Sequence, residues 1–91
     1  MNAMYVTPSV PKTGKTISVC YEWDPPTPGA VVTIDVAYAP NDDGNETLGP
    51  LVCPAVGGMA CALTNPVPTG KTGVTFTDST GQAPQESRVV A

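Results

Sequence analysis

The three cysteines, Cys20, Cys53 and Cys61, are the side chains of this 91-residue chain with the most chemistry available to them. A catalytic thiol needs a neighbouring group that lowers its pKa, and histidine is the usual one. The chain contains no histidine, which also excludes Ser-His-Asp triads and zinc sites that use an imidazole ligand. We therefore expect the cysteines to form a disulfide or to remain reduced, and we assign no catalytic residue.

The spacing of the cysteines predicts which two could pair. Cys53 and Cys61 flank Gly57-Gly58 symmetrically, and a Gly-Gly pair between apolar segments is a hairpin signal. Cys53 and Cys61 would then lie opposite one another, within reach of a cross-hairpin disulfide, with reduced thiols as the alternative. Cys20 alternates with residues expected to face solvent, whereas Cys61 alternates with Leu63, an expected core residue. A bridge from Cys20 to Cys61 is therefore disfavoured.

Two Gly-Lys-Thr triplets, at residues 14–16 and 70–72, match part of a phosphate-binding loop. The complete motif has a second glycine five residues before the first, and a helix follows it. Ser9 and Asn65 occupy those glycine positions, and each triplet precedes a predicted strand. We reject a nucleotide site at either place.

The acidic residues offer no better site. Residues 41–46 hold three carboxylates, but the helix-loop-helix calcium loop places its ligands at alternate positions between two helices. We interpret this segment as a solvated turn and expect neither a metal nor any other cofactor. Most of the eight Asp and Glu residues fall in turns or at outward strand positions, so we expect no carboxylate pair for glycoside hydrolysis.

Composition limits both the possible fold classes and the possible classes of partner. Lys and Arg number 4 against 8 for Asp and Glu, giving a net charge of −4, so the basic surface that nucleic acid requires is missing. No apolar run approaches the roughly 18 residues of a membrane span. The 12 Val and 12 Thr residues against only 3 Leu favour strands over helices.

Alternation of apolar and polar residues predicts about seven strands separated by Pro- and Gly-rich turns. The predicted strands are residues 5–10, 16–23, 31–39, 48–56, 59–63, 72–77 and 87–91. We expect an all-β, seven-stranded antiparallel β-sandwich forming a single domain over residues 1–91, with residues 1–10 as an N-terminal arm or an edge strand. The expected core residues are Tyr21, Trp23, Ile34, Val36, Leu63, Val74 and Phe76.

Three stretches resemble a fibronectin type III domain. Residues 18–26 resemble its second strand, in which a core tryptophan is followed by prolines, and residues 34–40 resemble its third. Residues 67–70 with 72–77 are similar to the stretch that leads into its sixth strand. The resemblance implies a fibronectin type III-like sandwich, with a more general immunoglobulin-like sandwich as the alternative. The family's tyrosine at the start of the sixth strand is replaced here by Thr72 or Gly73, so its corner hydrogen bond is expected to be missing.

The N-terminal residues are the expected contact surface. Met1, Met4, Tyr5 and Val6 are apolar and belong to an uncharged segment, which on a small domain suits docking onto another protein. The small, uncharged residues on the predicted outer faces of the strands favour protein partners too.

The chain begins with Met and spans one predicted domain, which resembles the small immunoglobulin-like and fibronectin-like proteins that decorate bacteriophage particles. This resemblance implies a non-enzymatic virion protein that binds the major capsid protein or other virion subunits and that forms homo-oligomers around a local symmetry axis. The alternative is an extracellular adhesive or spacer module of a secreted or cell-surface protein. An accessory domain of a glycoside hydrolase is the remaining alternative.

Overall fold

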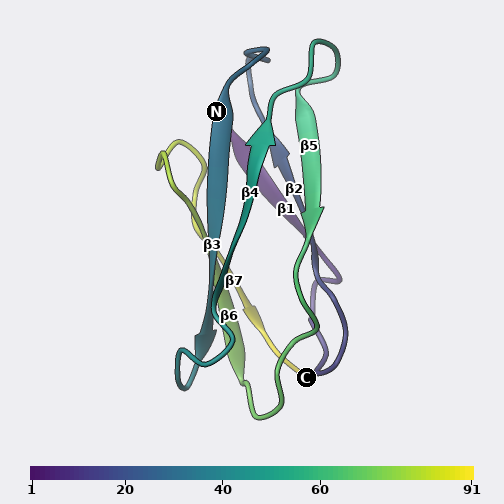
Figure 1. Cartoon of the computed structure of the whole chain (residues 1–91), viewed down its shortest axis with the longest axis vertical. Helices are drawn as coiled ribbons and strands as arrows, with labels where there is room; N and C mark the ends of the chain where they lie inside the picture. Colours follow the sequence, from purple (N-terminus) through teal and green to yellow (C-terminus); the bar gives the residue numbers. More distant parts are fainter.

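The computed structural model describes residues 1–91 and contains seven strands and no helix (Figure 1). It therefore has no helix that could cross a membrane. The predicted bounds are right for β3 and β5, whereas the other five strands begin or end elsewhere. The strands are β1 (Ala3–Thr7), β2 (Ser18–Glu22), β3 (Val31–Ala39), β4 (Glu46–Val52), β5 (Met59–Leu63), β6 (Gly73–Asp78) and β7 (Glu86–Val89).

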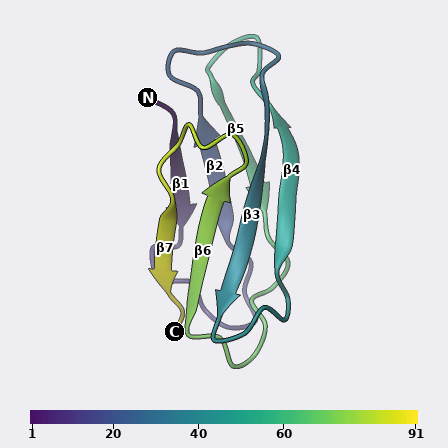
Figure 2. The same ribbon diagram turned by 90° about the vertical axis from the view of Figure 1, so that its left-hand side faces the viewer.

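The strands form two antiparallel sheets, which confirms the expected seven-stranded antiparallel all-β architecture. One sheet has the order β1-β2-β5, and the other has the order β4-β3-β6-β7. Figure 2 shows the four-stranded sheet in front of the three-stranded one. β4 and β5 are consecutive in the sequence but belong to different sheets, so Gly57-Gly58 joins the two layers. The hairpin expected there is wrong.

The core lies between the sheets and follows the alternation of each strand. Eighteen buried hydrophobic residues form one cluster, which includes Tyr21 and Phe76 at 0 % exposure. Trp23 packs edge-on against Tyr21, with ring centroids 4.7 Å apart. All of the expected core residues are buried except Leu63, which is 65 % exposed. β5 instead turns Ala60 and Ala62 toward the core.

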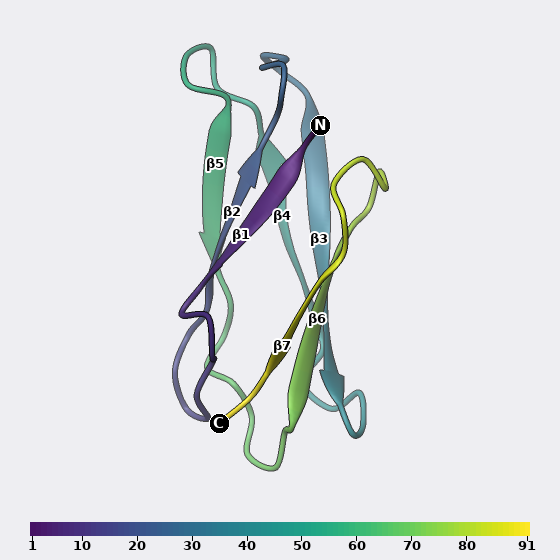
Figure 3. The same ribbon diagram turned by 180° about the vertical axis from the view of Figure 1, so that it is seen from behind.

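The N-terminal residues are an edge strand rather than a free arm. β1 pairs with β2 from Ala3 opposite Glu22 to Thr7 opposite Ser18, and Figure 3 shows it beside β2, inclined to the long axis of the molecule. The same figure shows the two chain ends toward opposite ends of the long axis. Because neighbouring residues of a strand point to opposite faces, β1 carries both core and surface side chains.

Candidate functional site

The outer face of the three-stranded sheet brings together side chains from three separate parts of the chain. β2 lies in the middle, and its pairing with β1 and β5 aligns the outward residues in three rows of three. We call these nine residues the disulfide face. Its rows are Ala3, Glu22 and Met59; Tyr5, Cys20 and Cys61; and Thr7, Ser18 and Leu63.

The central row holds the only disulfide of the molecule, between Cys20 and Cys61. The expected pairing of Cys53 with Cys61 is therefore wrong. Cys53 follows β4 in the other sheet, where its thiol is buried and free. Cys20 and Cys61 occupy opposite positions on neighbouring strands, with their Cα atoms 4.0 Å apart, in a bridge on the outer face. The expectation that Cys20 and Cys61 do not pair is therefore wrong as well. Two cysteines on adjacent strands of one sheet can pair when both face outward.

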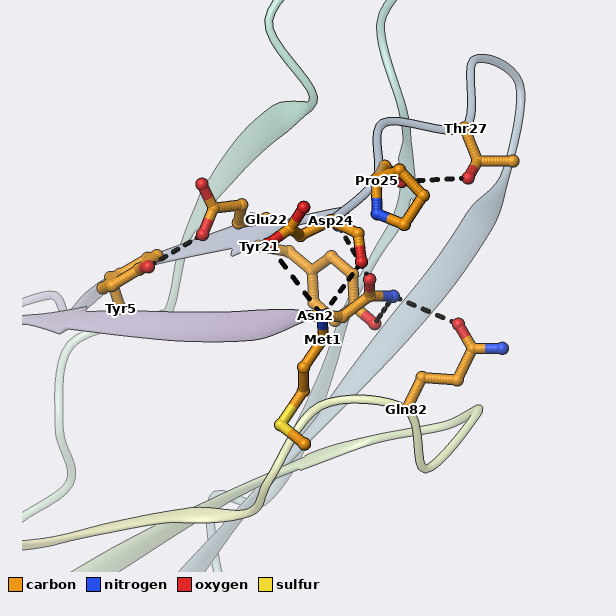
Figure 4. Close-up of polar contacts among 9 residues, drawn as sticks. All are labelled: Met1, Asn2, Tyr5, Tyr21, Glu22, Asp24, Pro25, Thr27 and Gln82. Atoms are coloured by element: carbon orange, nitrogen blue, oxygen red, sulfur yellow. Dashed lines mark hydrogen bonds and ion pairs between the residues drawn. The ribbon is translucent and has the colours of Figure 1, made fainter.

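Large apolar side chains surround the disulfide. Tyr5 is 49 % exposed, Met59 41 % and Leu63 65 %. Glu22 is the only charged residue of the disulfide face, and its carboxylate accepts a 2.8 Å hydrogen bond from the Tyr5 hydroxyl (Figure 4). This hydrogen bond and the negative charge of Glu22 raise the pKa of Tyr5 above its ordinary 10.0. Tyrosine and methionine with few charges are typical of the centre of protein–protein interfaces.

Two of the four expected contact residues are exposed. Tyr5 lies on the disulfide face, and Met1, just before β1, is 83 % exposed. Met4 and Val6 are only 4 % and 8 % exposed, because the alternation of β1 turns them into the core. Their assignment as partner contacts is wrong.

A buried polar network that the sequence did not predict fixes the start of β1. The Asn2 side-chain amide donates to the Tyr21 hydroxyl at 2.9 Å and to Gln82 Oε1 at 3.1 Å, and Asn2 Oδ1 accepts from the Asp24 backbone N–H at 2.9 Å (Figure 4). The Met1 amino group donates to the Asp24 carbonyl at 3.0 Å. These contacts hold β1 against β2 and so position Tyr5 on the disulfide face.

The Tyr21 hydroxyl continues this network across the core. It donates a 2.6 Å hydrogen bond to Asp78 Oδ2 at the end of β6, which ties the two sheets together. Burial favours the neutral carboxyl of Asp78, but hydrogen bonds from Tyr21, Thr80 and the Ala83 N–H outweigh it and lower the pKa of Asp78 below its ordinary 3.8. The start of β6 carries no tyrosine, and the phenol that links the two sheets is that of Tyr21 in β2.

The second Gly-Lys-Thr triplet has a structural role. The Lys71 ammonium, in the second Gly-Lys-Thr triplet, donates to the backbone carbonyl and side chain of Asn41 and lies 5.9 Å from the centroid of the Tyr38 ring. Lys71 is buried, so it holds the turn between β3 and β4 in place and is not free for a phosphate.

A surface depression lies beside β3 and β4. It has a volume of about 370 Å³ and is lined by Asp35, Val36, Ala37, Asn45, Glu46 and Thr47. Its carboxylates accept hydrogen bonds from within the chain: Asp35 from the Thr47 hydroxyl at 3.1 Å, and Glu46 from the Asn65 N–H at 3.0 Å. No three His, Cys, Asp or Glu side chains are grouped so as to hold a metal ion. The disulfide face is therefore the best candidate for function.

Comparison with known proteins adds no further constraint. No family model matches the chain, and neither a curated protein nor a solved structure matches it.

Proposed function

We propose that this chain is a non-enzymatic, protein-binding β-sandwich of the fibronectin type III-like kind, which decorates the outside of a bacteriophage capsid. The observation that carries the protein-binding part is the disulfide face, where Tyr5, Met59 and Leu63 are exposed around a disulfide with a single carboxylate among the nine residues. Burying such a surface against another protein releases water from apolar area without stripping many charges of their hydration.

Strand order supports the fibronectin type III-like alternative over a constant-type immunoglobulin domain. In the constant-type arrangement the fourth strand belongs to the same sheet as the first, second and fifth. Here β4 pairs with β3 in the other sheet, and β5 is the last strand beside β2. The core tryptophan at the end of β2, packed on Tyr21, is consistent with the same alternative.

The disulfide supports a location outside the reducing cytoplasm. Disulfides persist on secreted proteins and on virion and cell surfaces, because thiol reductants keep cytosolic cysteines reduced. The Cys20–Cys61 bridge lies on the outer face of its sheet, where a cytosolic dithiol would have access to it. This observation fits the exterior of a virion. It equally favours our second candidate, an extracellular adhesive or spacer module.

Replacing Tyr5 with alanine is expected to weaken binding to the capsid at least about tenfold. Tyrosine anchors at interface centres commonly contribute more than about 1.4 kcal/mol, which is a factor of ten in affinity. The measurement is cosedimentation of the purified chain with capsids assembled from a bacteriophage major capsid protein. Val89→Ala is the matched control, because Val89 is 71 % exposed in the other sheet and should leave binding unchanged.

Two results would count against the proposal. If the wild-type chain never cosediments with assembled capsids, the virion assignment fails. If Val89→Ala weakens binding as much as Tyr5→Ala does, the disulfide face is not the contact surface. Retention on host cell-surface protein, lost in Tyr5→Ala, would favour the adhesive module instead.

A further inference from the structure

β5 ends the three-stranded sheet, and one side of its backbone is unpaired. Trp23 N–H donates to the Gly58 carbonyl at 2.8 Å, and Thr64 N–H donates to the Ile17 carbonyl at 2.9 Å. The backbone groups of successive residues in a strand point to opposite sides. Because Gly58 and Thr64 bond toward β2, the even-numbered residues of β5 between them do so too. The N–H and C=O groups of Met59, Cys61 and Leu63 therefore point away from the sheet, and no loop hydrogen bond reaches them.

Two of the other three edge strands, β4 and β7, carry features that prevent pairing with another chain. β4 contains Pro50 and faces a register shift in β3, and β7 contains Glu86 and Arg88. β1 has no such residue within the strand, but Pro8 directly follows it. Prolines, charges and irregularities of this kind block edge-to-edge association. β5, with the sequence Met-Ala-Cys-Ala-Leu, has no proline, glycine or charge, and no proline directly follows it, so its free edge carries no protecting feature.

We propose that two copies of the chain pair through β5, antiparallel about a two-fold axis at Cys61, to form one six-stranded sheet. In this register Met59 lies opposite Leu63 of the second copy, and Cys61 lies opposite its own equivalent. The unpaired N–H and C=O groups of both edges then become hydrogen-bonded. The inference goes beyond the proposed function, because it needs no capsid.

The sequence of β5 is size-matched to its own copy. It is nearly palindromic about Cys61, with alanine at 60 and 62 and a large apolar residue at 59 and 63. Antiparallel self-pairing therefore places large side chains against large ones and alanine against alanine, and no charge faces a like charge. Pairing also makes the two disulfide faces continuous, since Met59 and Leu63 belong to both surfaces.

The dimer is expected to be in reversible equilibrium with the monomer. A five-residue strand pair buries less than the roughly 1,200 Å² of stable interfaces. Each copy also carries a net charge of −4, and this repulsion is screened by salt. Association should therefore rise with protein concentration and with ionic strength.

Sedimentation equilibrium of the full chain from about 10 µM to about 1 mM tests the association. We expect the average mass to rise from monomer toward dimer, and to rise further at higher salt. Leu63→Pro removes a donor from the free edge without removing a hydrogen bond to β2, and it should keep the chain monomeric throughout. Leu63→Ala, which keeps that donor, should still dimerise.

The register has its own test, which does not depend on how Leu63→Pro folds. Opposed residues in an antiparallel hydrogen-bonded pair are about 5.5 Å apart between Cα atoms, a distance that a disulfide can bridge. Met59→Cys and Leu63→Cys chains mixed under mild oxidation should form covalent dimers several-fold faster than either chain alone. A chain that stays monomeric at every concentration, or equal cross-linking in the mixture and in the separate chains, would overturn the proposal. Neither experiment measures capsid binding, so its failure leaves the proposed function standing.

Discussion

Replacing both Cys20 and Cys61 with serine is expected to lower the free energy of unfolding by about 3–4 kcal/mol. The bridge joins residues 41 positions apart, and cross-linking a loop of this length removes that much loop-closure entropy from the unfolded chain. Small domains are stable by about 5–15 kcal/mol in total. Urea unfolding, followed by tryptophan fluorescence with and without a dithiol reductant, measures the loss.

Unfolding should begin in β5 once the disulfide is reduced. This strand turns only Ala60 and Ala62 toward the core, so little apolar burial holds it once the bridge is open. Hydrogen exchange of the Ala60 and Ala62 amides should accelerate on reduction before exchange in β3 does.

Cysteine variants also test the pairing itself. Cys53→Ala should keep the full sensitivity to reductant, and the double serine variant should lose it. If Cys53→Ala abolishes the sensitivity, Cys53 is bridged and the assigned disulfide is wrong. If the reductant destabilises the double variant as much as the wild type, the bridge is not the source of the effect.

The strands could be predicted because their signal is local. Alternation within β3 makes its inward residues 6 % exposed or less, and the same pattern is present in the sequence. The assignment of strands to sheets is not local. A Gly-Gly turn allows β4 and β5 to form a hairpin or to cross between layers, and the choice depends on which neighbour buries more apolar surface. The predicted Cys53–Cys61 disulfide is wrong because it depends on a β4–β5 hairpin, and the two strands lie in different sheets.

Only part of the disulfide face could be predicted from the sequence. The apolar, uncharged surroundings of Tyr5 select it correctly, but the same criterion also selects Met4 and Val6, which face the core. Strand alternation applied to residues 3–7 would have placed both in the core. The polar network had no comparable signal, since Asn2 lies 19 residues from Tyr21 and 80 from Gln82 in the sequence.

Replacing Asp78 with alanine is expected to cost about 3 kcal/mol at neutral pH. The carboxylate accepts hydrogen bonds from the Tyr21 hydroxyl, from Thr80 and from the Ala83 N–H. Without it, the buried Tyr21 hydroxyl and Ala83 N–H lose their acceptor, which costs roughly 1–3 kcal/mol for each donor left unsatisfied. Asp78→Asn keeps the shape and one acceptor oxygen, so it should cost less. Urea unfolding of the three proteins gives both differences.

The Asp78 contribution should also depend on pH, with a definite sign. Because the folded state lowers the pKa of Asp78 below 3.8, the unfolded chain binds its proton first as the solution is acidified. The stabilisation is fully present above pH 3.8 and is lost as the pH falls through the lowered folded-state pKa. The wild type should therefore lose more stability than Asp78→Asn between neutral pH and about pH 2. The other seven Asp and Glu side chains and the C-terminal carboxylate are common to both proteins and cancel in this comparison. A constant difference across that range would mean that Asp78 does not stabilise the fold through its ionised form.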